Sequence, residues 1–338
     1  MARAEDYKAL EFERPILELE RKISQLEANA GARGRNLEHL AILRRMLDRL
    51  KVEVYSKLSA FEKVQIARFE QRPQTSDYIS YIFDDFVELH GGKVYREDRS
   101  TITGVGRIGN RRVMLIGHEK GKTTAEKIQR NFGCPHPEGY RKALQKMELA
   151  EKFQIPIVTL VNTPGAYPGV EAEERGQAYA IAINLMRMSQ LRTPILSIVI
   201  GEGGSGGALG IAVSDRLAIL EYAYYSVISP EGCSAILWKT NENKADAAEA
   251  LRLTAQDLLA LGVVEDVLPE PPGGAHRNPE AMAKTVKEYI LSTLDKLSGI
   301  DGQTLLETRY QRLRRVGVVI EHAVPLAPAA APGEGAPT

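Results

Sequence analysis

The chain has 338 residues with 44 basic and 44 acidic side chains, so its formal net charge is zero. A neutral chain argues against a nucleic-acid-binding protein, which needs a basic surface. Its two cysteines, Cys134 and Cys233, are too few for a disulfide framework or a four-thiolate zinc site. We therefore expect a reducing, cytoplasmic setting. Neither a secretory signal nor an apolar run of the ~20 residues that span a membrane is evident.

The N-terminal part predicts two helices. Pro15 suits a first helical turn, and the residues that follow it at helical spacing are Ile16, Leu19, Ile23 and Leu26. Glycines at 31 and 34 interrupt this pattern, and a longer helix is predicted from Asn36 to Phe69. We expect a helical hairpin that packs on the main body or on a partner subunit.

Beyond Pro73 the pattern alternates between helices and strands. Helices are predicted at 76–89, where residues 90–92 would end the helix, and at 138–153, 171–190 and 208–213. Strands are predicted at 101–108 and 112–117, joined by a hairpin at Gly109-Asn110, and at 157–161, 195–200 and 217–220. Residues 230–297 continue as helices broken at 263–267, and the Ala/Pro/Gly-rich residues 327–338 predict a disordered tail. This alternation is typical of an α/β domain.

The segment GEGGSGGAL at 201–209 is the most informative feature of the chain. Five glycines between a predicted strand and a predicted helix leave the backbone N–H groups accessible to a group that is or becomes negative. We interpret this turn as an oxyanion hole, in which two N–H groups stabilise one oxygen of a transition state. The alternative is that the glycines only allow the helix and strand to pack closely.

Three other motifs compete for the same region. Gly201, Gly203 and Gly206 match a dinucleotide-binding fingerprint with Glu221 as the ribose acid, but 104–109 matches the same pattern inside a hairpin. Ser205 matches a nucleophile elbow with His276 and His322 as candidate bases, yet His276 lies in a loop without an acid of its own. Residues 117–123 are one residue too short for a phosphate-binding P-loop.

A second loop, TPGAYPG at 163–169, follows the preceding predicted strand. Two prolines fix its path and two glycines again leave amides accessible. Since strand ends are where α/β proteins bind ligands, we expect this loop to complete the site. Its candidate ligand-binding residues are Gly165, Ala166, Tyr167, Pro168 and Gly169.

These two loops and several other segments closely resemble the carboxyltransferase α subunit of bacterial acetyl-CoA carboxylase, over about residues 10–317. The other matching segments are RNFG (130–133), PEGYRKAL (137–144), EERGQ (173–177), SVISPEGC (226–233), GGAHRNPEAM (273–282) and RYQRL (309–313).

The resemblance implies a crotonase-type fold, a spiral of ββα units, with an N-terminal helical extension. The domain division expected on this basis is a helical hairpin at 1–72, a carboxyltransferase domain at 73–298, a C-terminal helix and extension at 299–326, and the tail at 327–338. The resemblance further implies an α2β2 assembly with a β subunit that carries a four-cysteine zinc ribbon. No metal is expected in this chain. Biotin carboxylase and the biotin carboxyl carrier protein are implied as further partners.

The implied reaction moves a carboxyl group from carboxybiotin on its carrier to acetyl-CoA and forms malonyl-CoA for fatty acid biosynthesis. The resemblance assigns the biotin ureido oxygen to amides of Gly206 and Gly207, and the thioester enolate to the β subunit. Gly203, Gly204 and Ser205 are the expected substrate contacts beside them. No side-chain base is needed if the released biotin anion takes the methyl proton.

Two further points stay open at the level of sequence. Lys120, Lys122 and Arg130 are candidate contacts to coenzyme A phosphates or to the carrier, although a solvated helix face explains them equally well. Rival functions are a carboxyltransferase for another acyl-CoA such as propionyl-CoA, and a structural or regulatory scaffold that binds messenger RNA.

Overall fold

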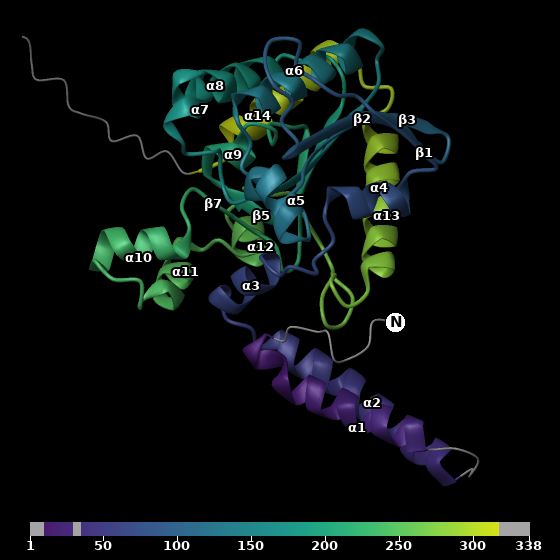
Figure 1. Cartoon of the computed structure of the whole chain (residues 1–338). Helices are drawn as coiled ribbons and strands as arrows, with labels where there is room; N and C mark the ends of the chain where they lie inside the picture. The colour runs from purple at the N-terminus through teal and green to yellow at the C-terminus, as the bar shows by residue number, and fades with distance from the viewer. Residues whose placement is uncertain (1–9, 30–34, 318–338) are drawn as a thin grey trace, which may run out of the picture.

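The computed structural model of the chain describes residues 10–29 and 35–317 (Figure 1). The elements before the sheet are η1 (Glu11–Glu13), α1 (Arg14–Asn29), α2 (Arg35–Ser56), α3 (Ala60–Ala67) and α4 (Thr75–Ile82). The strands are β1 (Asp85–Glu88), β2 (Thr101–Ile108), β3 (Arg111–His118), β4 (Ile157–Thr163), β5 (Ile195–Gly204), β6 (Arg216–Leu220), β7 (Tyr224–Ser226) and β8 (Asp266–Leu268). The remaining helices are α5 (Thr124–Gln129), η2 (Asn131–Gly133), α6 (Pro137–Lys152), α7 (Val170–Glu174), α8 (Gln177–Met188), α9 (Ser205–Leu209), α10 (Pro230–Trp238), α11 (Lys244–Leu251), α12 (Ala255–Ala260), α13 (Pro279–Leu297) and α14 (Gly302–Arg314).

The strands form one mixed sheet in the order β1-β2-β3-β4-β5-β6-β8, with β7 added beside β5. The first three strands are antiparallel, and every later pairing is parallel. This confirms the predicted α/β class and the hairpin at Gly109, which adopts a φ of +61°. Because β4 and β5 are neighbours and parallel, the loops that follow them lie at the same edge of the sheet.

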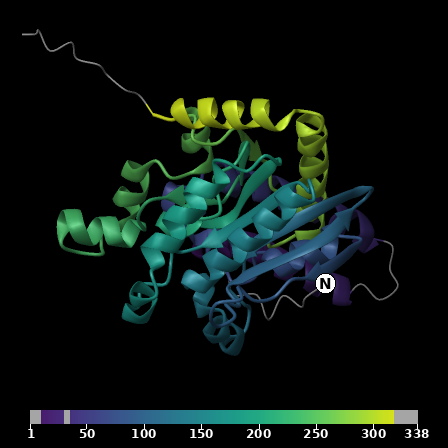
Figure 2. The same ribbon diagram turned by 90° about the horizontal axis from the view of Figure 1, so that it is seen from above.

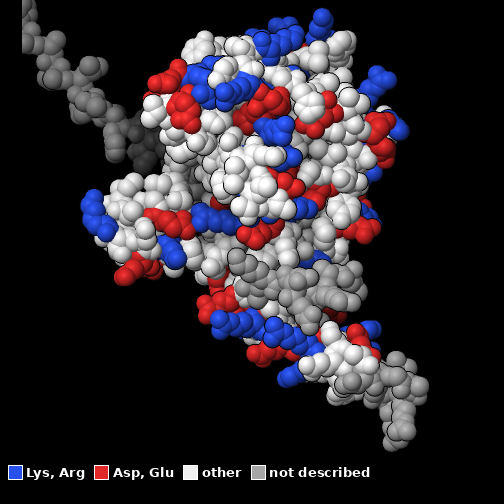
Figure 3. All heavy atoms as spheres, in the orientation of Figure 1, with Lys and Arg blue, Asp and Glu red and all other residues white. Residues whose placement is uncertain are grey.

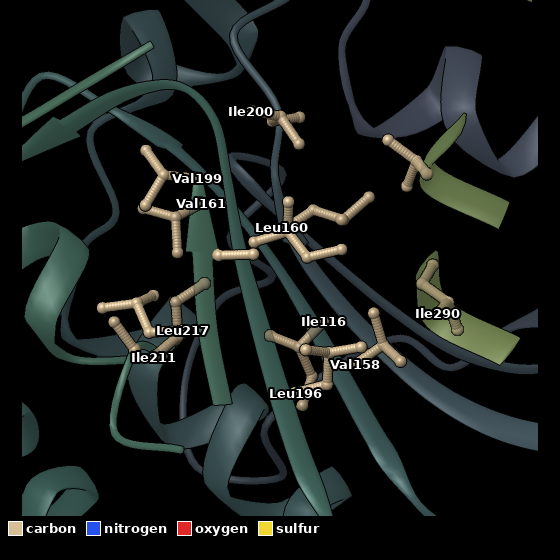
Figure 4. Packing of buried hydrophobic residues seen from close by; sticks show 14 of the residues in the cluster. Ile116, Val158, Leu160, Val161, Leu196, Val199, Ile200, Ile211, Leu217 and Ile290 are labelled. Atoms are coloured by element: carbon tan, nitrogen blue, oxygen red, sulfur yellow. The ribbon is translucent and has the colours of Figure 1, made fainter. Parts of the chain in front are cut away.

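The core lies on both faces of the sheet, since the central strands are buried along their whole length. On one face, Ile290 of α13 lies across from Val158 (Figure 4). On the other, Val161 and Val199 lie near Ile211 and Leu217 (Figure 4). Alternate side chains of β4 therefore supply both layers, as period-two geometry requires.

The N-terminal helices project from the body as a hairpin of α1 and α2, and α3 then contacts β5, β7 and α11 (Figure 1). The predicted single helix from Asn36 to Phe69 is wrong, because α2 ends at Ser56 and α3 begins at Ala60. The reason is local: Ser59 caps α3 by accepting from the Glu62 N–H, and the Glu62 carboxylate accepts from the Ser59 N–H.

The predicted helix at 76–89 is also wrong, since α4 ends at Ile82 and β1 follows, so residues 90–92 do not end a helix. β1 pairs with β2 in a register that places Phe86 opposite Gly106 and Glu88 opposite Gly104. A Cβ on Gly104 would overlap the Phe86 ring, and one on Gly106 would overlap Phe83. These two glycines admit the aromatic side chains that hold β1 on the sheet.

Other element ends differ from the predictions. Gly176, with a φ of +80°, divides the predicted helix 171–190 into α7 and α8. The predicted strand 195–200 continues to Gly204, and the short helix begins at Ser205 rather than 208. The predicted helices at 138–153 and within 230–297 are confirmed, including the break near 263–267.

The C-terminal part consists of α13 and α14, and α14 runs along the top of the view in Figure 2, with α13 descending from its right end. α14 is held by Arg309, whose fully buried guanidinium donates to both oxygens of Asp215 and to the carbonyls of Met188, Leu191 and Thr193. The predicted tail lies outside the described residues, and the four-part domain division stays a prediction. No helix of the part described is long and apolar enough to span a membrane.

Candidate functional site

A pocket of about 630 Å³ lies at the sheet edge where β4 and β5 end. Its walls come from the loop after β4, from the turn after β5, from the segment after β7 and from the start of α8. The lining from the two predicted loops is Gly165, Ala166, Tyr167, Pro168, Gly169, Gly204, Ser205, Gly206 and Gly207. The fold therefore brings together nine of the ten residues predicted for these loops. The tenth, Gly203, is buried under Tyr225 instead.

The glycines of this turn serve two different purposes. A Cβ on Gly204 would overlap the Pro164 carbonyl, and one on Gly207 would lie closer than 3.0 Å to backbone atoms of Gly165. A Cβ on Gly206 meets only Ile181, at 3.8 Å, on the pocket wall. Close packing thus explains Gly204 and Gly207, whereas Gly206 leaves open space in the pocket itself.

The loop after β4 is held by hydrogen bonds from its neighbours. Tyr167 donates its N–H to the Pro135 carbonyl, and its ring stacks on His136 at a centroid distance of 4.1 Å. Gln177 donates from its side-chain amide to the carbonyls of Pro135 and Tyr167. Thr163 accepts the Gly165 N–H at 3.1 Å, which closes the start of the loop. The amides of this wall are therefore fixed before any ligand arrives.

A buried ionic network lies under the glycine turn. Glu202 accepts hydrogen bonds from Arg68 at 2.7 Å, from the Tyr224 hydroxyl at 2.7 Å and from Lys120. Burial alone would raise the pKa of Glu202, but the cations Lys120 and Arg68 outweigh it and lower that pKa to about 2. Glu202 therefore stays ionised and anchors the last residues of β5 to three other parts of the chain.

The pocket offers little for side-chain nucleophilic catalysis. Burial raises the pKa of the Cys134 thiol to about 11, so this lining cysteine stays protonated at neutral pH. No histidine occurs among the described residues that line the pocket, so Ser205 has no base there. The Glu221 carboxylate accepts the Glu270 N–H and is already engaged. The arrangement instead presents backbone amides to a ligand.

The predicted basic contacts lie elsewhere. Lys120 pairs with Glu202, Lys122 pairs with Asp77, and Arg130 donates to the carbonyl of Arg99. None of these three lines the pocket among the described residues. Their contact with coenzyme A or with the carrier stays a prediction. No group of three or more His, Cys, Asp or Glu side chains that could hold a metal occurs within 10–29 and 35–317.

Sequence reasoning missed several lining residues. The lining also includes Tyr224 and Cys134, for which the sequence predicts no role, and Val227, Ile228 and Ser229, which enter the prediction only within a matching segment. The parallel pairing of Gly204 with Ser226 carries that segment to the pocket rim. β7 has only three residues, so the periodicity of the sequence gave no signal for it.

Solved structures share this architecture. The beta subunit of geranyl-CoA carboxylase from P. aeruginosa aligns with a TM-score of 0.53 at 16% identity, over 75% of this chain and 46% of that chain. The transcarboxylase 12S structure aligns with a TM-score of 0.51 at 21% identity, over 64% of this chain and 42% of that chain. This chain thus spans less than half of either. The shared fold is the crotonase-like carboxyltransferase fold, which confirms the predicted fold class.

Sequence comparison places the chain within one family of that class. The family described as "Acetyl co-enzyme A carboxylase carboxyltransferase-like" matches residues 9–317. The carboxyl transferase subunit alpha of Thermus thermophilus is 50% identical over 92% of this chain and 99% of its own length. The corresponding subunit of Xanthomonas axonopodis pv. citri is 52% identical over 93% and 98%. The chain belongs to the family of acetyl-coenzyme A carboxylase carboxyl transferase α subunits.

Proposed function

We propose that this chain is the carboxyltransferase α subunit that moves a carboxyl group from carboxybiotin to acetyl-CoA, forming malonyl-CoA for fatty acid biosynthesis. The observation that carries the proposal is the convergence of the loops 164–169 and 204–207 on one pocket, in a chain of this family. The proposed setting is the cytoplasm. Carboxybiotin is a substrate here, delivered by a separate carrier protein.

The proposed chemistry requires two oxygens to gain charge. The bond between the ureido nitrogen and the carboxyl carbon breaks, and its electron pair moves onto the ureido group. The acetyl methyl group loses a proton to that anion, and its carbon forms the new bond to the carboxyl carbon. In this proposal amides of Gly206 and Gly207 stabilise the ureido oxygen. Each such donor typically contributes about 2.7–4 kcal/mol to transition-state stability.

A β subunit is proposed to cover the pocket, to hold the thioester and to carry the zinc ribbon. Apolar side chains at or beside the pocket rim support this, because Val227 is 77% exposed, Val170 74% and Tyr179 67%. Exposed apolar side chains around a pocket are typical of a surface that a partner covers. Acidic and basic side chains are interspersed on the face shown in Figure 3, so no single-sign field there favours nucleic acid. Lys120, Lys122 and Arg130 remain secondary candidates for contact with the carrier or coenzyme A.

The test is carboxyl transfer in reverse, from malonyl-CoA to free biotin, with and without a co-expressed β subunit. We expect activity only in the complex, and its loss in Gly206→Val while the complex still assembles. An active complex that prefers methylmalonyl-CoA would instead identify a propionyl-CoA enzyme. No transfer with any acyl-CoA by an assembled complex would refute the proposal.

A further inference from the structure

Ser205 has an unusual backbone conformation for its residue type. It joins β5 to α9 with a φ of +52°, in the left-handed region. Gly204 beside it has a φ of −91°, and neither Gly206 nor Gly207 is left-handed. Serine therefore stands at the one position of the turn whose backbone favours glycine, since a Cβ is costly in this region.

Lys93, Asn131 and Phe132 are also left-handed, and three further left-handed residues have an ordinary explanation. Gln154, Lys239 and Arg252 each lie at or just after the end of a helix, where a left-handed residue closes the last turn. Ser205 instead begins a helix, where no such closure is needed. Backbone strain that persists at Ser205, where glycine would relieve it, points to a role for the serine side chain.

The side chain of Ser205 does not contribute to the protein's own stability in any visible way. It is exposed in the pocket, and no hydrogen bond joins its hydroxyl to another residue that the structure describes. Neighbouring polar groups of the lining differ in this respect. Tyr224 donates to Glu202, and Ser229 accepts the Gly232 N–H. The Ser205 hydroxyl is thus available to a ligand.

We propose that Ser205 donates a hydrogen bond from its hydroxyl to an oxygen of the carboxylated ureido group, and that the left-handed backbone aims it there. The inference rests on the proposed function, because it names the substrate of that same pocket. A hydroxyl donor to a carboxylate oxygen forms a charge-assisted hydrogen bond. Ser205 would then orient the group that the amides of the turn stabilise.

The test compares Ser205→Gly and Ser205→Ala in the complex with the β subunit. Both are expected to lower kcat/KM for biotin by about 10- to 100-fold, the usual effect of losing a hydrogen bond to a charged group. The KM for malonyl-CoA is expected to stay within about 2-fold, because the thioester is held elsewhere. Ser205→Gly should also raise Tm by up to roughly 3 °C through relief of the backbone, whereas Ser205→Ala should not.

Gln154→Gly is the matched control, because Gln154 has the same φ of +52° and lies at the other end of the sheet, before β4. It should show the gain in Tm without the loss of activity. Wild-type kcat/KM for biotin in Ser205→Gly would overturn the inference, and so would a loss confined to malonyl-CoA. An assembled wild-type complex without any transfer activity would instead refute the proposed function itself, and this inference with it.

Discussion

Gly206 and Gly207 lie side by side in the turn, yet the structure predicts opposite effects for the same substitution. An alanine Cβ at Gly206 enters open space, with Ile181 as its nearest neighbour at 3.8 Å. An alanine Cβ at Gly207 lies closer than 3.0 Å to backbone atoms of Gly165 and Ala166, which have no flexible side chain to move aside. Gly207→Ala must therefore displace the loop that forms the opposite wall of the pocket.

The magnitudes follow from this geometry. Overpacking of this kind typically costs about 1–3 kcal/mol, so Gly207→Ala should lower the free energy of unfolding by that amount and Tm by several degrees. Gly206→Ala should not lower the free energy of unfolding, and the higher helix propensity of alanine should raise it by at most about 1 kcal/mol. Gly206→Val would fill more of the pocket while leaving the protein's own contacts intact.

Thermal unfolding of the purified variants and reverse carboxyl transfer by their complexes measure the two effects separately. We expect Gly206→Val to lose transfer at an unchanged Tm, and Gly207→Ala to lose both. If Gly206→Val retained full activity, the pocket at Gly206 would not hold the substrate. If Gly207→Ala were as stable as the wild type, the close approach of the two loops would be wrong.

Three further predictions concern charged groups. The pKa of Glu202 is lowered in the folded protein, so its ion pairs stabilise the fold fully above the unfolded pKa of 4.5. This stabilisation is lost as the pH falls toward about 2. The free energy of unfolding of Glu202→Gln, measured in urea, should therefore depend less on pH between these values. Arg309→Met should lower the free energy of unfolding by about 3–5 kcal/mol, because Asp215 is left buried without its cation; the urea midpoint measures this. Lys122→Ala, which breaks an exposed pair with Asp77, should change it by less than about 1 kcal/mol in the same assay.

Most of the parallel part of the fold could be predicted from sequence, because β4 and β5 are continuous apolar runs bounded by turn residues. The segment 76–89 could not, since its apolar residues follow helical spacing through to Phe86 and Leu89. β1 depends instead on a partner strand whose two glycines make room for the ring of Phe86 and for that of Phe83, just before β1. Only the pairing, which joins residues far apart in the sequence, decides between helix and strand there.

The break between α2 and α3 is a different kind of error, because its signal is present in the sequence. Ser59 followed by Glu62 is the pattern of a capping box, and it lies directly before the apolar residues of α3. Apolar residues at helical spacing continue on both sides of the break, so the periodicity of the sequence shows no interruption there. Local capping chemistry outweighed periodicity at this point.

At the site, sequence predicted which two loops meet but not how the glycine segment is built. Glycine has a low strand propensity, so residues 201–204 suggested a turn rather than the end of a strand. Two contacts hold this segment as a strand although its glycines have no side chains to pack. β7 pairs with Glu202 and Gly204, and the Glu202 carboxylate binds Arg68 from the end of α3. The glycine-rich end of β5 can be rigid because its one charged residue, Glu202, is bound by the cations Arg68 and Lys120.

This network links the N-terminal helices to the pocket. Arg68 follows α3 and also donates to Glu231, the second residue of α10, and to the Tyr224 hydroxyl on the pocket wall. One guanidinium therefore contacts the strand that ends in the turn, the strand beside it and the helix beyond the pocket rim. Amides stabilise a developing charge only when they are already in place. We infer that the N-terminal helices matter to this site through the rigidity that Arg68 gives the glycine turn.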